Sequence, residues 1–176
     1  ELFERLFLLT SKSVLYVANI NEGSISGDDR LFNKVKNYAE KNGSKALKIS
    51  SKIECEIMEL PEEEQKIFLD DIGLDESGLN KIIREGYSLL ELITFFTHNE
   101  KELRAWTLKK GLTAPKAAGK IHSDFEKGFI KAEVTKCSDL FKHGSEQILK
   151  ELGLVSIHGH DYVVNDGDII LFKFHI

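Results

Sequence analysis

Side chains able to bind a polar ligand follow two short apolar runs near the start of the chain. The tetrad Asn19-Ile20-Asn21-Glu22 follows Val14–Ala18, and Ser50-Ser51-Lys52 follows Ala46–Ile49. Short continuous apolar runs of this kind are typical of strands buried on both faces of a parallel sheet. Because ligands bind outside the carboxyl ends of such strands, these amide, carboxylate, hydroxyl and ammonium groups are candidates for ligand recognition.

An intervening helix is expected to bring the two polar loops to the same edge of a sheet. Asp28 or Asp29 can cap this helix, and Gly43 can end it. Strand, loop, helix, strand and loop form the repeat of a doubly wound α/β sheet. Apolar residues with helical spacing occupy the segment between the cap and the glycine: Leu31, Phe32, Val35, Tyr38 and Ala39.

The tetrad has the residue types needed to recognise a purine base. P-loop GTPases carry Asn-Lys-x-Asp here, and the aspartate accepts two N–H groups from guanine. In this chain Ile20 replaces the lysine, and Glu22, one methylene longer, replaces the aspartate. Asparagine pairs bidentately with adenine, so Asn19 can bind the base and Ile20 can cover its face. From spacing alone, an ordinary polar loop after a strand is the expected interpretation.

The second loop has two compatible interpretations. Ser51, Lys52 and the neighbouring backbone N–H groups can contact the same base, or Ser50 or Ser51 can cap the helix that follows. Further helices are expected up to about Leu90. Pro61 can open one of them, and Asp75 or Ser77 can cap another.

From residue 91 onward the pattern changes to strands. Helix signals are limited to Thr113–Ile121, with Pro115 in the first turn and an alanine-rich face, and to short helices around Gly144 within Ser138–Leu149. A sheet that wraps one helix, a β-grasp module of the α+β class, fits this order. The expected strands are Ile93–Thr97, Leu103–Leu108, Phe129–Val134, Leu154–Ile157, Tyr162–Val164 and Ile169–Phe174.

Charge is distributed unevenly along this acidic chain, whose net charge is −5. Residues 51–76 contain ten acidic side chains and two lysines, whereas residues 101–136 contain nine basic and four acidic ones. A basic segment can neutralise RNA phosphates, although charge runs are usually solvated faces that pair with nearby acids such as Asp124 and Glu126. The candidate RNA-contacting or ribosome-contacting side chains are Lys109, Lys110, Lys116 and Lys120.

Composition excludes several other classes of protein. No apolar stretch approaches the roughly 18 residues needed to span a membrane, and no signal-peptide pattern is present. Cys55 and Cys137 form no close pair, which favours a cytoplasmic location. His158 and His160 alternate along an expected strand without an evident third ligand, so we expect no metal site. No DNA partner is expected.

The wording of the second half resembles a known domain. The stretch RAWTLKKGLTAPKAAGKIHSDFEKGFIKAEV from Arg104, together with DYVVNDGDIILFKF from Asp161, is similar to the C-terminal TGS domain of YchF-type (Obg-like) ATPases. The resemblance extends over the whole chain and is strongest from about Leu92. Residues His98-Asn99-Glu100 depart from it, because relatives usually have Ala-Gly-Pro at this hairpin turn.

This resemblance implies a domain arrangement and an activity. Residues 1–90 would be the C-terminal part of a P-loop nucleotide-binding domain with the tail of a helical insertion at Glu1–Leu9, and residues 91–176 would be the TGS domain. The family uses an Asn-x-x-Glu motif and prefers ATP to GTP, with Mg²⁺ as cofactor and ribosomes as partner. A GTP-binding regulator or a non-catalytic RNA-binding or protein-binding module is the alternative.

The sequence also predicts where the catalytic groups lie. The phosphate-binding pattern G-x-x-x-x-G-K-[ST] is absent from these 176 residues. The chain begins at Glu1, and Met58 is its only methionine, so we expect the C-terminal fragment of a longer protein. By resemblance, the phosphate and Mg²⁺ ligands precede Glu1. The 176 residues alone should therefore hydrolyse no nucleotide.

Overall fold

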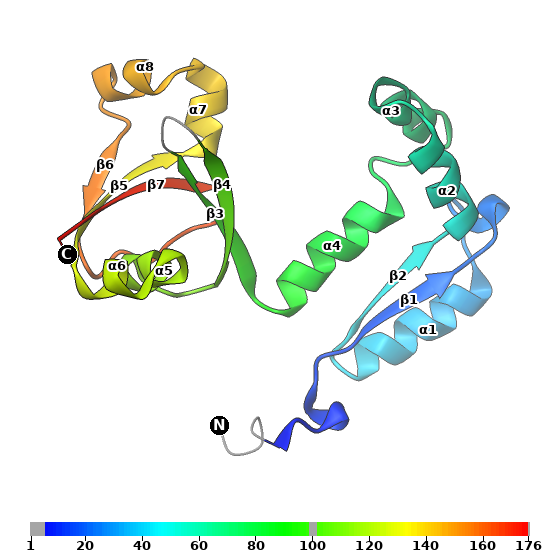
Figure 1. The fold of residues 1–176 in the computed structure, drawn as a ribbon. Coiled ribbons are helices and arrows are strands. Elements are labelled where there is room, and N and C mark those ends of the chain that lie inside the picture. Colours follow the sequence, from blue (N-terminus) through cyan, green and yellow to red (C-terminus); the bar gives the residue numbers. More distant parts are fainter. Residues whose placement is uncertain (1–5, 99–101, 176) are drawn as a thin grey trace. The chain divides into compact units, whose positions relative to one another are not determined.

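The structure is a computed structural model that describes residues 6–98 and 102–175 (Figure 1). The chain divides into two compact units of α/β structure, Glu1–Leu90 and Glu91–Ile176. The first unit contains a parallel pair of strands and the second a mixed sheet of five strands.

In the first unit, β1 (Leu15–Asn19) and β2 (Lys45–Ile49) pair in parallel, from Leu15 opposite Lys45 to Asn19 opposite Ile49. This register confirms that the two polar loops follow the same edge of the sheet. Among the described residues, 3₁₀ helices include η2 (Leu9–Ser11) and η3 (Glu22–Ser24). Its α-helices are α1 (Arg30–Lys41), α2 (Ser51–Glu59), α3 (Glu62–Asp71) and α4 (Gly78–Leu89).

Local signals place the starts of the helices in this unit. The Asp29 side chain caps α1 by accepting the N–H groups of Leu31 and Phe32, both at 2.8 Å, and Ser77 caps α4. Pro61 lies at the N-cap of α3, one residue before the first helical turn. Ser50 is the N-cap residue of α2, but its side chain makes no capping hydrogen bond.

One expectation for this unit is wrong. The β1 run is not buried on both faces, because Val17 is 42% exposed and the pair has no third strand among the described residues. The expected helix end at residues 1–9 stays a prediction, because residues 1–5 lie outside the described part.

Helices α2 and α4 meet through a close contact. The Glu54 carboxylate accepts the backbone N–H groups of Gly78 at 2.7 Å and Leu79 at 3.1 Å, the first two residues of α4. A carboxylate is stabilised at a helix N-terminus by these free N–H groups and by the helix dipole. A Cβ atom at Gly78 would lie 2.7 Å from both the Glu54 Oε1 atom and the Ile49 Cγ2 atom. Glycine is therefore required for this packing.

The second unit is built on a sheet with strand order β4-β3-β7-β5-β6. Strands β3 and β7 pair in parallel, and the other neighbours are antiparallel. Its strands are β3 (Leu92–His98), β4 (Leu103–Lys109), β5 (Phe129–Lys136), β6 (Ser156–His158) and β7 (Asp168–Phe174). Its helices are α5 (Ala114–Ile121), α6 (Ser123–Lys127), α7 (Cys137–His143) and α8 (Glu146–Glu151).

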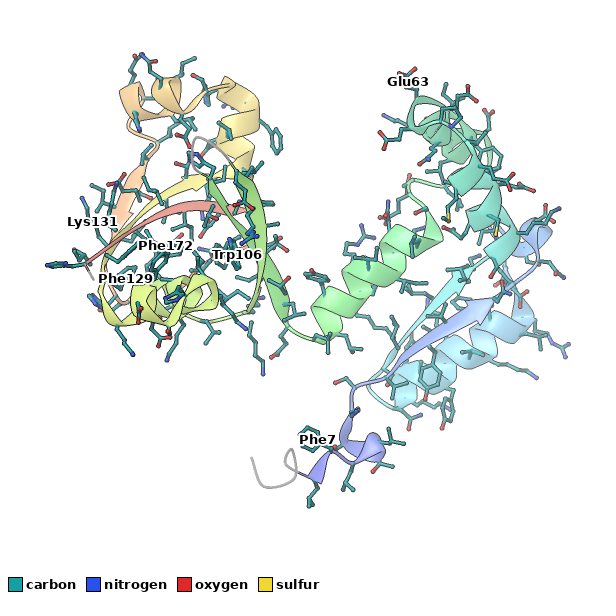
Figure 2. All side chains as sticks on the ribbon, in the orientation of Figure 1. Phe7, Glu63, Trp106, Phe129, Lys131 and Phe172 are labelled. Carbon is teal, nitrogen blue, oxygen red and sulfur yellow. The ribbon has the colours of Figure 1, made fainter. Side chains whose placement is uncertain are left out.

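Helix α5 lies against one face of this sheet and closes the core (Figure 1). Ala114, Ala117 and Ala118 are completely buried, which confirms the predicted inward face of the helix. Small side chains let the helix approach the sheet closely. Phe129 and Phe172 lie between sheet and helices (Figure 2), with ring centroids 6.3 Å apart.

The segment Tyr162–Val164 is not a strand. It makes one isolated bridge, between Val163 and Thr113, with the Val164 N–H donating to the Leu112 carbonyl at 3.1 Å and the Ala114 N–H to the Tyr162 carbonyl at 2.8 Å. The Tyr162 side chain reaches the completely buried carboxylate of Asp168. That carboxylate accepts hydrogen bonds from the Tyr162 hydroxyl at 2.8 Å and the Asn165 backbone N–H at 2.9 Å, and also pairs with Lys136.

The hairpin turn that departs from the family pattern falls largely outside the described part of the chain. Residues 99 and 100 are not described, whereas His98 ends β3 and pairs with Glu146.

Candidate functional site

The two polar loops of the first unit are joined by a direct hydrogen bond. The Oδ1 atom of Asn19 accepts the backbone N–H of Ser51 at 3.0 Å. The adjacent N–H of Ile20 donates to the carbonyl of Ile49 at 2.8 Å and continues the strand pairing for one more residue. Both contacts follow from the parallel register, which puts Asn19 opposite Ile49. The loops therefore form one surface at the carboxyl edge of β1 and β2.

A second link between the loops is ionic. The Lys52 Nζ atom lies 2.8 Å from the Glu22 Oε1 atom and 3.8 Å from the carboxylate of Glu56, one turn further along α2. The hydrogen bond to Glu22 and the charge of that carboxylate raise the pKa of Lys52. Lys52 is thus positively charged at neutral pH. All five predicted base-binding residues lie at this edge: Asn19 ends β1, Ile20 follows it, Glu22 begins η3, and Ser51 and Lys52 are the first two residues of α2.

The groups facing solvent define what this surface can bind. Asn19 and Ser51 are exposed, and Ile20 is half-buried beside them. Because the Oδ1 atom of Asn19 is held by Ser51, its amide orientation is fixed and the Nδ2 atom remains available as a donor. The surface offers hydrogen-bond donors and acceptors next to an apolar side chain, a combination suited to a planar heterocycle.

Sequence reasoning missed Lys48, which holds the first loop in place. The Lys48 Nζ atom donates to the backbone carbonyls of Gly27 at 2.7 Å and Ser24 at 3.3 Å. The Ser26 hydroxyl ties the same loop to the carbonyl of Ile72 at 2.8 Å. Lys48 lies on β2 within the apolar run Ala46–Ile49, and a lysine inside such a run was the available signal in the sequence.

The predicted basic surface of the second unit is only partly free of ion pairs. Lys116 pairs with Glu126 at 2.5 Å, as the alternative interpretation expected. Asp124 instead lies 3.5 Å from His122. The exposed ammonium groups without an ion pair in the described part of this segment belong to Lys109, Lys110, Lys120 and Lys127.

Other candidate groups have structural surroundings. Trp106 packs against the core and donates its indole N–H to the Thr97 hydroxyl at 2.9 Å, and Phe125 stacks on Phe174. His158 stacks on Tyr162, and His160 contacts Phe129 edge to face. Within residues 6–98 and 102–175, no three His, Cys, Asp or Glu side chains are arranged to hold a metal ion. No helix in the same ranges could cross a membrane.

Comparison with known proteins identifies relatives of the chain. Residues 92–175 match the family model YchF-GTPase_C, described as a protein of unknown function (DUF933). The chain is 47% identical to the ribosome-binding ATPase YchF of Bacillus subtilis strain 168, over all of this chain and 49% of that protein. It is 45% identical to the Escherichia coli O157:H7 protein of the same name, over 97% of this chain and 47% of the relative.

Solved structures give the same result. The YchF GTPase of Schizosaccharomyces pombe superposes with a TM-score of 0.83 at 35% identity, over 97% of this chain and 46% of that one. A GTP binding protein from Pyrococcus horikoshii OT3, at 20% identity and a TM-score of 0.62, shares the fold over 92% of this chain and 45% of its own. The chain spans about half the length of the relatives it matches. These similarities confirm the resemblance found in the sequence.

Proposed function

Since this chain belongs to the YchF family, we propose that it is the C-terminal half of a cytoplasmic ATPase that associates with ribosomes. Residues 1–90 contribute the base-recognition end of a P-loop nucleotide-binding domain, and residues 91–176 form a β-grasp TGS domain. The observation that carries the nucleotide proposal is the hydrogen bond from Ser51 N–H to Asn19 Oδ1, which joins the two loops into one surface.

Each residue of this surface has a distinct role in the proposal. The Nδ2 group of Asn19 donates to a ring nitrogen of adenine, and its Oδ1 atom, which accepts the Ser51 N–H through one lone pair, accepts the neighbouring amine through the other. Ile20 covers the face of the base, and the Ser51 hydroxyl binds its edge. Glu22 and Lys52 contribute paired charges beside them. We propose that ATP binds as its Mg²⁺ complex. Residues of this chain would contact the base, and residues of the full-length protein that precede Glu1 would bind the phosphates and Mg²⁺.

A competition experiment tests the base preference. Labelled ATP bound to the full-length protein that carries this chain is displaced with unlabelled ATP or GTP, and we expect ATP to compete more strongly. Asn19→Ala should weaken ATP binding by roughly 1–3 kcal/mol, the range for a good bidentate base contact. Asn37→Ala, an exposed asparagine on α1, is the matched control and should leave binding unchanged. A preference for GTP would contradict the adenine proposal.

The chain by itself should not hydrolyse ATP. Phosphoryl transfer needs a phosphate cradle and a positioned metal ion, and the G-x-x-x-x-G-K-[ST] pattern is absent from the sequence. A phosphate-release assay on the purified 176-residue chain checks this expectation. Hydrolysis that disappears in Asn19→Ala would place catalytic groups within the chain and refute this assignment.

RNA binding by the second unit is the other function we propose, because Lys109, Lys110 and Lys120 have no ion pair among the described residues. Lys116, held by Glu126, would contribute less. Each phosphate neutralised adds roughly −0.7 to the slope of log affinity against log salt for a single strand. Salt titrations of ribosome or RNA binding should give a shallower slope for Lys109→Glu/Lys110→Glu than for Lys34→Glu/Lys36→Glu on α1. Equal slopes would exclude this surface.

A further inference from the structure

The carboxylate of Glu22 is already engaged by an ammonium group in this structure. Lys52 approaches one carboxylate oxygen to 2.8 Å, and its ammonium group also lies 3.8 Å from the carboxylate of Glu56, one turn further along α2. The Lys52 side chain is 65% exposed and that of Glu22 is 48% exposed, so a ligand can reach both. A ligand that binds beside Glu22 therefore meets a carboxylate whose charge is neutralised by Lys52 and whose Oε1 atom already accepts a hydrogen bond.

The two purines respond differently to such a pair. Guanine presents two neighbouring N–H donors, which fit both oxygens of a free carboxylate. Adenine presents an amine donor beside a ring-nitrogen acceptor. The Glu22–Lys52 pair presents an acceptor beside a donor, which complements adenine but sets one guanine donor against the donating ammonium of Lys52. A buried or partly buried donor left without an acceptor weakens binding.

We propose that Lys52 is a specificity-determining residue that favours adenine by withholding the Glu22 carboxylate from guanine. Selectivity then comes from an element that disfavours the competing ligand as well as from the contacts of Asn19 with the preferred one. This inference rests on the proposed function, because it requires that the two loops meet the base of a bound nucleotide.

Removal of the ammonium group is the central experiment. Lys52→Met keeps the length of the side chain and frees Glu22, so the dissociation constant for GTP should fall about tenfold relative to that for ATP in the full-length protein. Hydrogen bonds to a charged group change affinities by about ten- to a hundredfold, and the exposure of this pair favours the lower end. Lys66→Met, an exposed lysine on α3 outside both loops, is the matched control and should leave both constants unchanged.

Further variants test whether the effect passes through Glu22. Lys52→Met/Glu22→Gln should lose the gain in GTP binding, because guanine then has no carboxylate to accept its two donors. Lys52→Arg preserves the ion pair and should keep the original ratio of the two constants. Three results together support the inference: tighter GTP binding by Lys52→Met, loss of that gain in the double variant, and an unchanged ratio of the two dissociation constants in Lys52→Arg. Circular dichroism confirms that all variants fold.

The outcomes separate this inference from the function on which it rests. If the wild-type protein prefers GTP or binds neither nucleotide, the proposed function fails. The wild type can prefer ATP while Lys52→Met leaves the ratio of the two dissociation constants unchanged, or weakens binding of both nucleotides equally. In that case Lys52 does not discriminate between the bases, and only the inference is overturned. A gain in GTP binding that persists in Lys52→Met/Glu22→Gln would also overturn it, because Glu22 would then play no part.

Discussion

The two units bury their apolar side chains to very different extents. Of the seventeen apolar residues buried in the described chain, only Ala39, Ile53 and Ile57 belong to the first unit. The five-stranded sheet of the second unit encloses its own core with α5, and Phe95 and Leu108 are completely buried there. The second unit thus has an apolar core of its own, whereas the first unit has few buried apolar residues and is joined largely by polar contacts.

The exposed face of the parallel pair explains this contrast. Parallel strands are normally covered on both faces, yet Val17 on β1 is 42% exposed in the first unit. Three hydrogen-bonded contacts connect its elements: the Ser51 N–H with Asn19, Lys48 with two backbone carbonyls, and the first residues of α4 with Glu54. Such links fix the geometry of loops but contribute less stability than a closed apolar core.

Separation of the units is the strongest test of this comparison. Residues 91–176 produced alone should retain a cooperative unfolding transition, because the buried cluster around Phe95 lies entirely within them. Residues 1–90 alone should lack one, because too little apolar surface is buried to offset chain entropy. Urea titration followed by circular dichroism measures both. A cooperative transition in the first piece would show that its polar links suffice for folding.

A core truncation should give the next largest effect. Phe95→Ala removes a completely buried ring that meets Phe172 edge to face, and should lower the free energy of unfolding of the second unit by about 3–5 kcal/mol. Val17→Ala, at the exposed face of β1, should cost less than about 1 kcal/mol in the first unit. Denaturant titration of the intact chain compares the two. Similar losses would remove the proposed difference between the cores.

The contact between α2 and α4 predicts an intermediate effect within the first unit. Gly78→Ala forces a Cβ atom against Ile49 and Glu54 and should destabilise the unit by about 1–3 kcal/mol. Gly86→Ala, in the same helix with no atom within 4 Å of the added Cβ, should instead stabilise it by about 0.5–1 kcal/mol. Thermal unfolding of both variants compares their melting temperatures. Equal shifts in melting temperature would show that the packing around Gly78 tolerates an added Cβ atom.

The smallest predicted effect is the pH dependence of the second unit. Burial lowers the pKa of Lys136, but the hydrogen bond and charge of Asp168 outweigh it and raise the pKa overall. Burial and then the hydrogen bond to Asp168 raise the pKa of Tyr162, and burial followed by nearby carboxylates raises that of Cys137. All three groups stabilise the folded state fully below their unfolded pKa values, and this contribution disappears as pH rises through the folded ones.

Stability should therefore decrease above about pH 9, where the thiol begins to titrate, and further above about pH 10. Because Lys136 is 45% exposed, its contribution to the free energy of unfolding should be no more than about 1 kcal/mol. Denaturant titrations at pH 8 and pH 11 in a Cys137→Ser background isolate the contribution of Lys136 and Tyr162. Asp168→Asn should flatten the remaining dependence, and an unchanged slope would assign it to other groups.

Local chemistry made much of the fold predictable. Asp29 as a helix cap, the alanine face of α5 and the glycine end of α7 each depend on residues close in sequence. The adjacency of the two polar segments was predictable as well, because segments that follow two paired parallel strands lie at one edge of the sheet. The pairing of Glu22 with Lys52 follows from that geometry but has no signal in either loop alone.

The features that were missed or mistaken depend on distant partners. The hydrogen bond from the Gly78 N–H to Glu54 joins residues 24 positions apart. The buried Asp168 carboxylate likewise pairs with the distant Lys136, a partner that local propensity cannot anticipate. Val17 has a strand pattern typical of complete burial, but exposure depends on how many strands and helices surround it. Tertiary context overrode the local pattern in each case.

The position of β4 at the edge of its sheet has a consequence for self-association. Within the described residues β4 pairs with β3 alone, so its outer backbone groups could template a strand from another molecule. The guanidinium of Arg104 lies over the Trp106 ring, 5.0 Å from its centroid, and Lys109 ends the same strand. The Arg104 guanidinium also pairs with Glu102 at 3.2 Å, so the edge presents charged side chains of both signs together with Lys109. Charged side chains on an edge strand disfavour strand-mediated aggregation.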